Sequence, residues 1–136
     1  MFKYNLYIYI GIFSILYSGY DLYSTYFDLG YINKYNQMLK SNNLGDIYSL
    51  FGLNKNQFLI GIILLETIPG LLFIAYGNKK NKELKEILFH INNLVNMNSK
   101  KIHIMKIPNA EKFDYNTLIK YINKNYHHNN DVEFLL

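Results

Sequence analysis

Glu66 is the residue whose type and position most clearly suggest chemistry. It lies about halfway along residues 58–76, an apolar run that contains no other charged residue. Pro69 and Gly70 follow in the same run, and Pro69 has no N–H, so it frees the carbonyl oxygen of Leu65 from its helical hydrogen bond. An acid, a helix distortion and a free carbonyl close together are what a proton or cation site requires.

The same residues also suit a structural role. The apolar runs 4–20 and 58–76 contain no Lys, Arg or His to pair with Glu66, and an unpaired ionised carboxylate is costly in a membrane. We therefore expect Glu66 to be protonated and hydrogen-bonded to a serine, a tyrosine hydroxyl or a backbone carbonyl. We favour a structural role, in which this hydrogen bond holds the helix against another helix or against a second copy of the chain, over ion transfer.

A polar stripe runs along the first predicted helix. Its members recur at steps of three and four residues and so share one helical face: Gly11, Ser14, Ser18, Asp21, Thr25 and Asp28. Small and hydroxyl residues on one face are typical of a helix-packing seam in membranes, and a polar conduit leading to Asp21 is the alternative. In an antiparallel pair of helices we expect Glu66 to match the depth of Ser14 or Ser18, and Asp21 to lie at least a turn away.

Two apolar runs define the predicted fold of the first part of the chain. Residues 4–20 carry no charge, residues 58–76 carry only Glu66, and both lengths are close to that of a bilayer core. Tyrosines near both ends of the first run resemble the aromatic belts of spanning helices. The sequence thus predicts an α-helical membrane hairpin of two transmembrane helices over residues 1–77, with an outer loop at about 29–57. A buried hairpin in a soluble bundle is the alternative.

Lysines that follow the second run predict the orientation of the chain. The net charge of +4 is concentrated after residue 78, at Lys79, Lys80, Lys82 and Lys85. Because Lys-rich flanks stay on the cytoplasmic side, residues 78–136 should be cytoplasmic, with Met1 on the same side, and the charge does not indicate nucleic-acid binding. We expect a multi-pass protein of the prokaryotic plasma membrane, with the mitochondrial inner membrane as the alternative.

Residues 78–136 predict a small α/β tail in the order helix, strand, helix, strand. Apolar residues at helical spacing follow residue 81, and residues 101–107 alternate as a strand does. Asp114 is placed to cap a second helix, and residues 131–136 suit a short terminal strand. Strand, helix and strand at this spacing favour a right-handed βαβ unit with parallel strands.

The tail shows no catalytic pattern. The chain has no cysteine, which excludes disulfides and thiolate chemistry, and its four histidines lack the spacing of a metal site. A glycine-rich phosphate loop and a nucleophile elbow are also missing. We predict no enzyme activity, no catalytic residues, no cofactor and no metal.

Residues 20–36, "YDLYSTYFDLGYINKYN", carry a resemblance to a known family. They resemble an uncharacterised prokaryotic family of small membrane proteins whose first helix contains Asp-x-x-x-Thr, followed by Gly and an Asn-Pro motif. The matching positions are Asp21, Thr25, Gly30 and Asn36. The chain departs from that pattern at residue 37, which is Gln where Pro is expected, and at residue 34, which is Lys near an expected acid. The resemblance implies a membrane protein and covers about half of the chain.

Three functions fit these patterns. The leading one is a structural or accessory membrane protein that sits in the lipid bilayer, assembles through polar helix faces with itself or a membrane-protein partner, and presents its tail to a cytoplasmic partner. The second is a proton- or cation-coupled transport component that uses Glu66. The third is an accessory subunit of an organelle-encoded respiratory complex, which an arginine-free chain rich in Asn, Ile, Tyr and Lys permits because an AT-rich genome produces that composition.

Overall fold

The computed structural model describes residues 3–126 and 132–136, and 76% of these described residues are helical. The chain divides into two compact units. We call Leu6–Tyr76 the helical-pair unit, and Met1–Asn5 together with Gly77–Leu136 the α/β unit. The long helix α4 (Lys55–Asn96) contributes residues to both, so each unit is described by itself.

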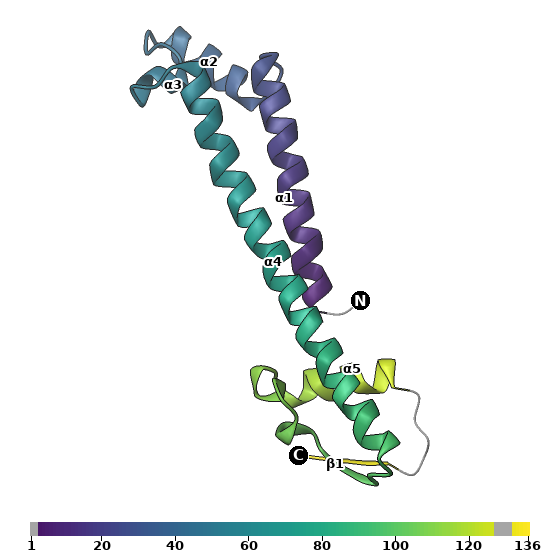
Figure 1. Cartoon of the computed structure of the whole chain (residues 1–136). Helices are drawn as coiled ribbons and strands as arrows, with labels where there is room; N and C mark the ends of the chain where they lie inside the picture. The colour runs from purple at the N-terminus through teal and green to yellow at the C-terminus, as the bar shows by residue number, and fades with distance from the viewer. Residues whose placement is uncertain (1–2, 127–131) are drawn as a thin grey trace. The chain divides into compact units, whose positions relative to one another are not determined.

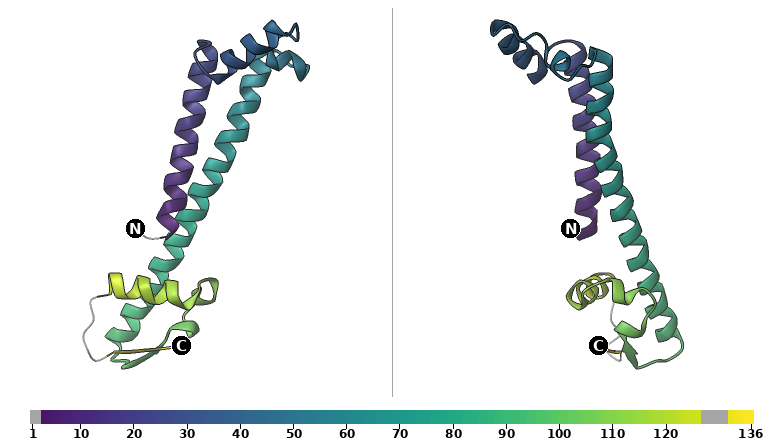
Figure 2. Two further views of the ribbon diagram at one scale, coloured as in Figure 1. Left: turned by 180° about the vertical axis from the view of Figure 1, so that it is seen from behind. Right: turned by 90° about the vertical axis from the view of Figure 1, so that its left-hand side faces the viewer.

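The helical-pair unit consists of two long helices and a short helical connection. Helix α1 (Lys3–Tyr26) lies beside the first part of α4, and their directions are opposite (Figure 1 and Figure 2). Between them the chain forms α2 (Tyr31–Ser41) and α3 (Ile47–Leu50), so the region predicted as an outer loop is largely helical. Positive φ angles at Asp28, Asn43, Gly45 and Gly52 mark the turns of this connection.

The prediction of a two-span membrane hairpin is wrong. Within the described residues only α4 is long and apolar enough to cross a membrane. Helix α1 has 24 residues, which is sufficient length, but tyrosine recurs along it together with serine, asparagine and Asp21. Residues 4–20 of α1 carry no charge, but they are less apolar than a membrane span requires. Their hydroxyl and amide groups also favour water over lipid.

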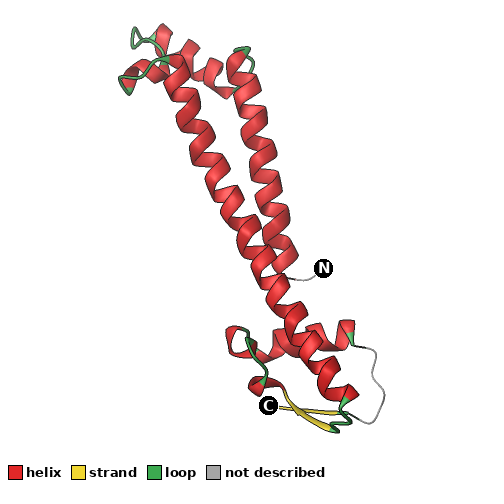
Figure 3. Ribbon diagram, viewed as in Figure 1, coloured by secondary structure: helices red, strands yellow, loops and turns green. Residues whose placement is uncertain are grey.

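The α/β unit contains the second part of α4 and a small parallel sheet. After α4 come β1 (Lys101–His103), the 3₁₀ turns η1 (Ile104–Lys106) and η2 (Ala110–Lys112), α5 (Tyr115–Asn125) and β2 (Glu133–Leu135) (Figure 3). Strands β1 and β2 pair in parallel, with Ile102 opposite Phe134, which confirms the predicted strand, helix, strand order and parallel pairing. Strand β1 ends earlier than predicted, because η1 replaces its second half. Asp131, which belonged to the predicted terminal strand, lies outside the described residues.

An apolar core holds the α/β unit together. Its largest fully buried side chains come from α4, β1, η1 and α5: Leu84, Ile87, Ile91, Ile102, Ile104, Leu118 and Ile122. The predicted cap of α5 is confirmed, since an oxygen of Asp114 accepts a hydrogen bond from the backbone N–H of Thr117 at 2.9 Å. The predicted tail helix is not a separate element, because α4 continues without interruption to Asn96.

Candidate functional site

Two carboxyl groups meet inside the helical-pair unit. Asp21 of α1 is completely buried, Glu66 of α4 is half-buried, and the two side chains lie close enough to interact electrostatically. A Cα–Cβ bond tilts toward the N-terminus of its own helix, so in an antiparallel pair the two side chains lean toward each other along the axis. The expectation that Asp21 would lie at least a turn away from Glu66 neglected this tilt.

Hydroxyl groups align the two helices beside this acid pair. The Oγ of Ser14 donates a hydrogen bond to the backbone oxygen of Glu66 at 2.8 Å, and the hydroxyls of Ser18 and Thr67 lie 3.0 Å apart. Ser14 and Ser18 thus lie at the depth of Glu66, as the sequence predicted, but they bond to backbone and to Thr67. Neither serine forms a hydrogen bond with the Glu66 carboxyl group among the described residues.

Gly11 and Gly70 allow the backbones of α1 and α4 to approach each other. A Cβ added to Gly70 would lie 2.9 Å from the backbone oxygen of Gly11, and one added to Gly11 would collide with the backbone oxygen of Gly70. Glycine is therefore required for close packing at this point, in the manner of small-residue contacts between membrane helices. Neighbouring Pro69 is exposed and borders a shallow apolar groove with Tyr7, Leu72, Phe73 and Tyr76.

Tyr31 adds a hydroxyl group to the acid pair. After α1 the chain turns back through residues 27–30, where the N–H groups of Leu29 and Gly30 bond to the carbonyl oxygen of Ser24. This turn places the start of α2 over the end of α1, and the Tyr31 hydroxyl donates to Oδ2 of Asp21 at 3.1 Å. Burial of the hydroxyl and the negative charge of Asp21 raise the pKa of Tyr31 to about 12, so it remains a donor at physiological pH.

Three oxygen atoms around the acid pair are buried and have no hydrogen-bond partner among the described residues. They are Oδ1 of Asp21, Oγ1 of Thr25 and Oε2 of Glu66. Two carboxylates in close contact repel each other, and a proton shared between them or a cation bound between them would remove that repulsion. Thr25 lies one helical turn from Asp21 on the same face of α1.

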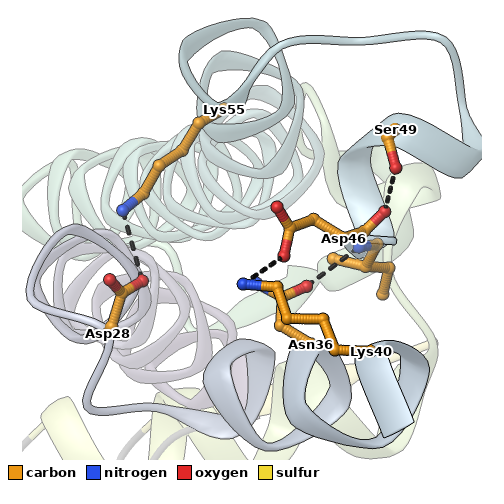
Figure 4. A network of polar contacts seen from close by, with 7 residues as sticks. Asp28, Asn36, Lys40, Asp46, Ser49 and Lys55 are labelled. Atoms are coloured by element: carbon orange, nitrogen blue, oxygen red, sulfur yellow. Dashed lines mark hydrogen bonds and ion pairs between the residues drawn. The ribbon is translucent and has the colours of Figure 1, made fainter. Parts of the chain in front are cut away.

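A second polar network closes the end of this unit (Figure 4). Asp28, at the end of the predicted stripe, forms an ion pair with Lys55 at 3.2 Å. The side-chain oxygen of buried Asn36 accepts a hydrogen bond from the N–H of Ile47 at 2.8 Å, and Lys40 pairs with Asp46 at 3.1 Å. These contacts fasten α2 and α3 to each other and the end of α1 to the start of α4, so they hold Tyr31 in place.

Sequence reasoning missed Tyr31 and Thr67. Tyr31 reaches Asp21 through a turn whose geometry depends on a positive φ at Asp28, and no short-range pattern indicates this. Thr67 lies next to Glu66 in the sequence and contacts Ser18. Because neighbouring positions on a helix point in different directions, its role appears only once the two helices are aligned.

The predicted topology lysines fall into different environments in the α/β unit. Lys80 forms an ion pair with Glu83 at 3.4 Å and lies over the ring of Phe113. Lys82 and Lys85 border a polar cavity, and Lys79 is exposed. Glu83 also pairs with Lys112 at 3.1 Å; burial opposes its ionisation, but these lysines hold the pKa of the Glu83 carboxyl below its usual range.

A scan against protein-family models found no match, and searches of the curated proteins and of the solved structures found no significant match either. The function of the chain is therefore inferred from its own residues and geometry.

Proposed function

We propose that this chain is a small membrane-anchored accessory protein, in which α4 supplies the membrane span and the helical-pair unit assembles with a membrane-embedded partner or a second copy. The observation that carries this proposal is the inverted polarity of the helical-pair unit. Its interior contains Ser18, Asp21, Ser24 and Thr25, all buried, whereas its outer surface is dominated by large apolar side chains.

The exposed apolar side chains are large and numerous. Leu65 is 78% exposed and Phe13 is 70% exposed, and similar residues continue along both helices: Leu6, Ile10, Ile12, Leu16, Ile60, Leu64, Ile68, Leu71, Leu72 and Phe73. A monomeric protein in water rarely exposes such a continuous apolar surface. Lipid chains or the helices of a partner would cover it, and the polar interior would then supply contacts between helices, where lipid gives no hydrophobic driving force.

The apolar part of α4 and the lysines after it support an orientation. Residues 58–76 match the thickness of a bilayer core, and Lys79, Lys80, Lys82 and Lys85 follow directly. The positive-inside rule favours a cytoplasmic α/β unit in a prokaryotic plasma membrane, or a matrix-facing one in a mitochondrial inner membrane.

Single cysteines test the anchor, because the natural chain has none. Ser41→Cys and Ser99→Cys lie on opposite sides of residues 58–76 in the sequence. On intact cells we expect a membrane-impermeant thiol reagent to label Ser41→Cys and to spare Ser99→Cys, and permeabilised cells should label both. Equal labelling of both variants on intact cells would contradict a span formed by α4.

Proton or cation binding is the second candidate function, and the contact between Asp21 and Glu66 favours it. An ion site within an apolar segment needs a second polar group next to Glu66, and Asp21 supplies one, with Tyr31 and Thr25 beside it. The pair would exchange a shared proton for a cation, or release the proton as one helix shifts.

The variant Glu66→Gln separates this function from a packing role. Gln keeps the volume and the hydrogen-bonding capacity of a protonated Glu, so assembly in mild detergent should survive, and Glu66→Ala should weaken it. Flux of protons or of a monovalent cation into reconstituted vesicles should disappear in Glu66→Gln and Asp21→Asn if the pair transfers ions. If the natural chain shows no ion flux, the acid pair has only a role in helix packing.

A further inference from the structure

The α/β unit contains a polar cavity of about 470 Å³ whose wall is rich in lysine. Helix α4 contributes Lys82 and Lys85, helix α5 contributes Lys124, and amide and hydroxyl groups complete the wall: Asn5, Asn78, Asn81, Tyr121 and Asn125. All of these residues belong to the α/β unit. The wall contains no carboxylate, so the cavity concentrates positive charge that its own side chains do not neutralise.

The three cavity lysines differ from other lysines of the same unit. Lys80 and Lys112 both form ion pairs with Glu83, and Lys101 pairs with Glu133. In contrast, Lys82, Lys85 and Lys124 form no ion pair with a carboxylate of the described residues. Ammonium groups brought together without a counter-charge repel each other, and an anion bound among them removes that repulsion.

Packing between α4 and α5 fixes the backbone positions that carry the cavity lysines. Leu84 and Ile87 of α4 and Leu118 and Ile122 of α5 are completely buried in the core of the α/β unit. A hydrogen bond of 2.7 Å from the Asn81 amide to the side-chain oxygen of Asn5 ties another part of the wall together. The cationic groups are therefore carried by two helices that share a core, and their approach does not depend on a flexible loop.

We propose that this cavity binds a phosphate-bearing anion, with Lys82, Lys85 and Lys124 as the cationic ligands and the asparagine amides as additional hydrogen-bond donors. Lysine is a common phosphate ligand in proteins, and the volume lies within the range of small-molecule sites, larger than a single phosphate requires. The phosphate belongs either to a soluble organic phosphate or to the headgroup of an anionic lipid. The proposal does not rest on the proposed membrane function, because the α/β unit contains the whole cavity.

Binding to the full chain in detergent micelles tests the proposal with two probes. The first probe is inorganic pyrophosphate, titrated by calorimetry at low ionic strength. The second is phosphatidylglycerol mixed into the micelles, with phosphatidylcholine as the uncharged reference. We expect saturable binding of one anion per chain to at least one probe. Binding to pyrophosphate alone would indicate a soluble ligand, and binding to phosphatidylglycerol alone would indicate a headgroup; either result supports the proposal.

Charge-removing variants decide whether the site is specific. We expect Lys85→Gln and Lys124→Gln each to weaken binding roughly tenfold, as the loss of one charge-assisted contact predicts. Lys120→Gln is the matched control, since it removes the same charge from α5 outside the cavity wall and should leave binding unchanged. Asn81→Asp should weaken binding further by placing a negative charge in the wall, and circular dichroism should show that each variant is folded. Equal weakening in all of these variants, or no saturable binding of either probe, would overturn the proposal.

Discussion

The two units of this chain are built with opposite polarity. In the α/β unit, isoleucine and leucine fill the core and its buried carboxylate, Glu83, is paired with lysines. In the helical-pair unit the groups buried along α1 include the hydroxyls of Ser18, Ser24 and Thr25 and the acid Asp21, and large apolar side chains such as Leu65 and Phe13 face outward. A single helix, α4, contributes to both arrangements.

Under the proposed function, this difference would suit each unit to a different environment. Burial of apolar surface stabilises a fold in water, so the α/β unit follows the rule for soluble proteins. The helical-pair unit gains nothing from its outer apolar side chains if they face water, but those side chains suit lipid or a partner's helices. Its internal stability must come from close backbone contact at Gly11 and Gly70 and from hydroxyl contacts.

The largest expected effect comes from an identical substitution in the two units. Leu84→Ala should destabilise the α/β unit by about 2–5 kcal/mol, because the completely buried leucine would leave a cavity. Leu65→Ala, at a position that is 78% exposed, should change the stability by less than about 0.5 kcal/mol. Thermal unfolding in detergent measures both effects, and hydrogen exchange of α5 amides reports the effect of Leu84→Ala on the α/β unit. A large effect at Leu65 would show that a second copy packs on this face in detergent.

An intermediate effect is expected from filling the close contact between α1 and α4. Gly11→Ala places a methyl group against the backbone oxygen of Gly70 and 2.6 Å from Cγ1 of Ile74, so it should destabilise the helical-pair unit by about 1–3 kcal/mol. Gly19→Ala, where no atom lies within 4 Å, is the control on the same helix. It should be neutral or stabilising by up to about 1 kcal/mol, because alanine favours helix. Hydrogen exchange along α1 distinguishes the two, and equal protection in both variants would place the helix contact elsewhere.

The smallest expected effect is the loss of stability when Glu83 is protonated at low pH. Its lysine partners hold the pKa of Glu83 below the ordinary 4.5, so the folded state binds a proton less readily than the unfolded state. The pair therefore contributes stability above about pH 4.5 and loses it as the pH falls through the lowered pKa. Because Lys112 is 43% exposed, we expect a contribution of only about 1 kcal/mol. In Glu83→Gln, the free energy of unfolding should depend less on pH between pH 6 and pH 3. If that dependence is unchanged, other carboxylates cause the loss of stability in acid.

Local sequence patterns predicted several elements correctly. Asp114 caps α5 because a side-chain oxygen three residues before a backbone N–H is sufficient for that contact. The parallel pairing of residues 101–103 with residues 133–135 followed from the order of strand, helix and strand. Local patterns failed for residues 4–20, where the lack of charge concealed the polarity of tyrosine. Two membrane spans were expected, whereas the described residues contain one candidate span.

The sequence by itself determined that Glu66 is an isolated acid in an apolar run, and that small and hydroxyl residues share one face of the first helix. Both facts depend only on residue type and helical period.

Only the tertiary structure decided what these residues contact. The antiparallel direction of α1 and α4 leans Asp21 toward Glu66, and a turn after α1 brings Tyr31 to the same acid. The meeting of Lys124 with Lys82 and Lys85 likewise depends on how α5 packs against α4. Contacts between residues far apart in the sequence follow from packing, and no local pattern of spacing contains that information.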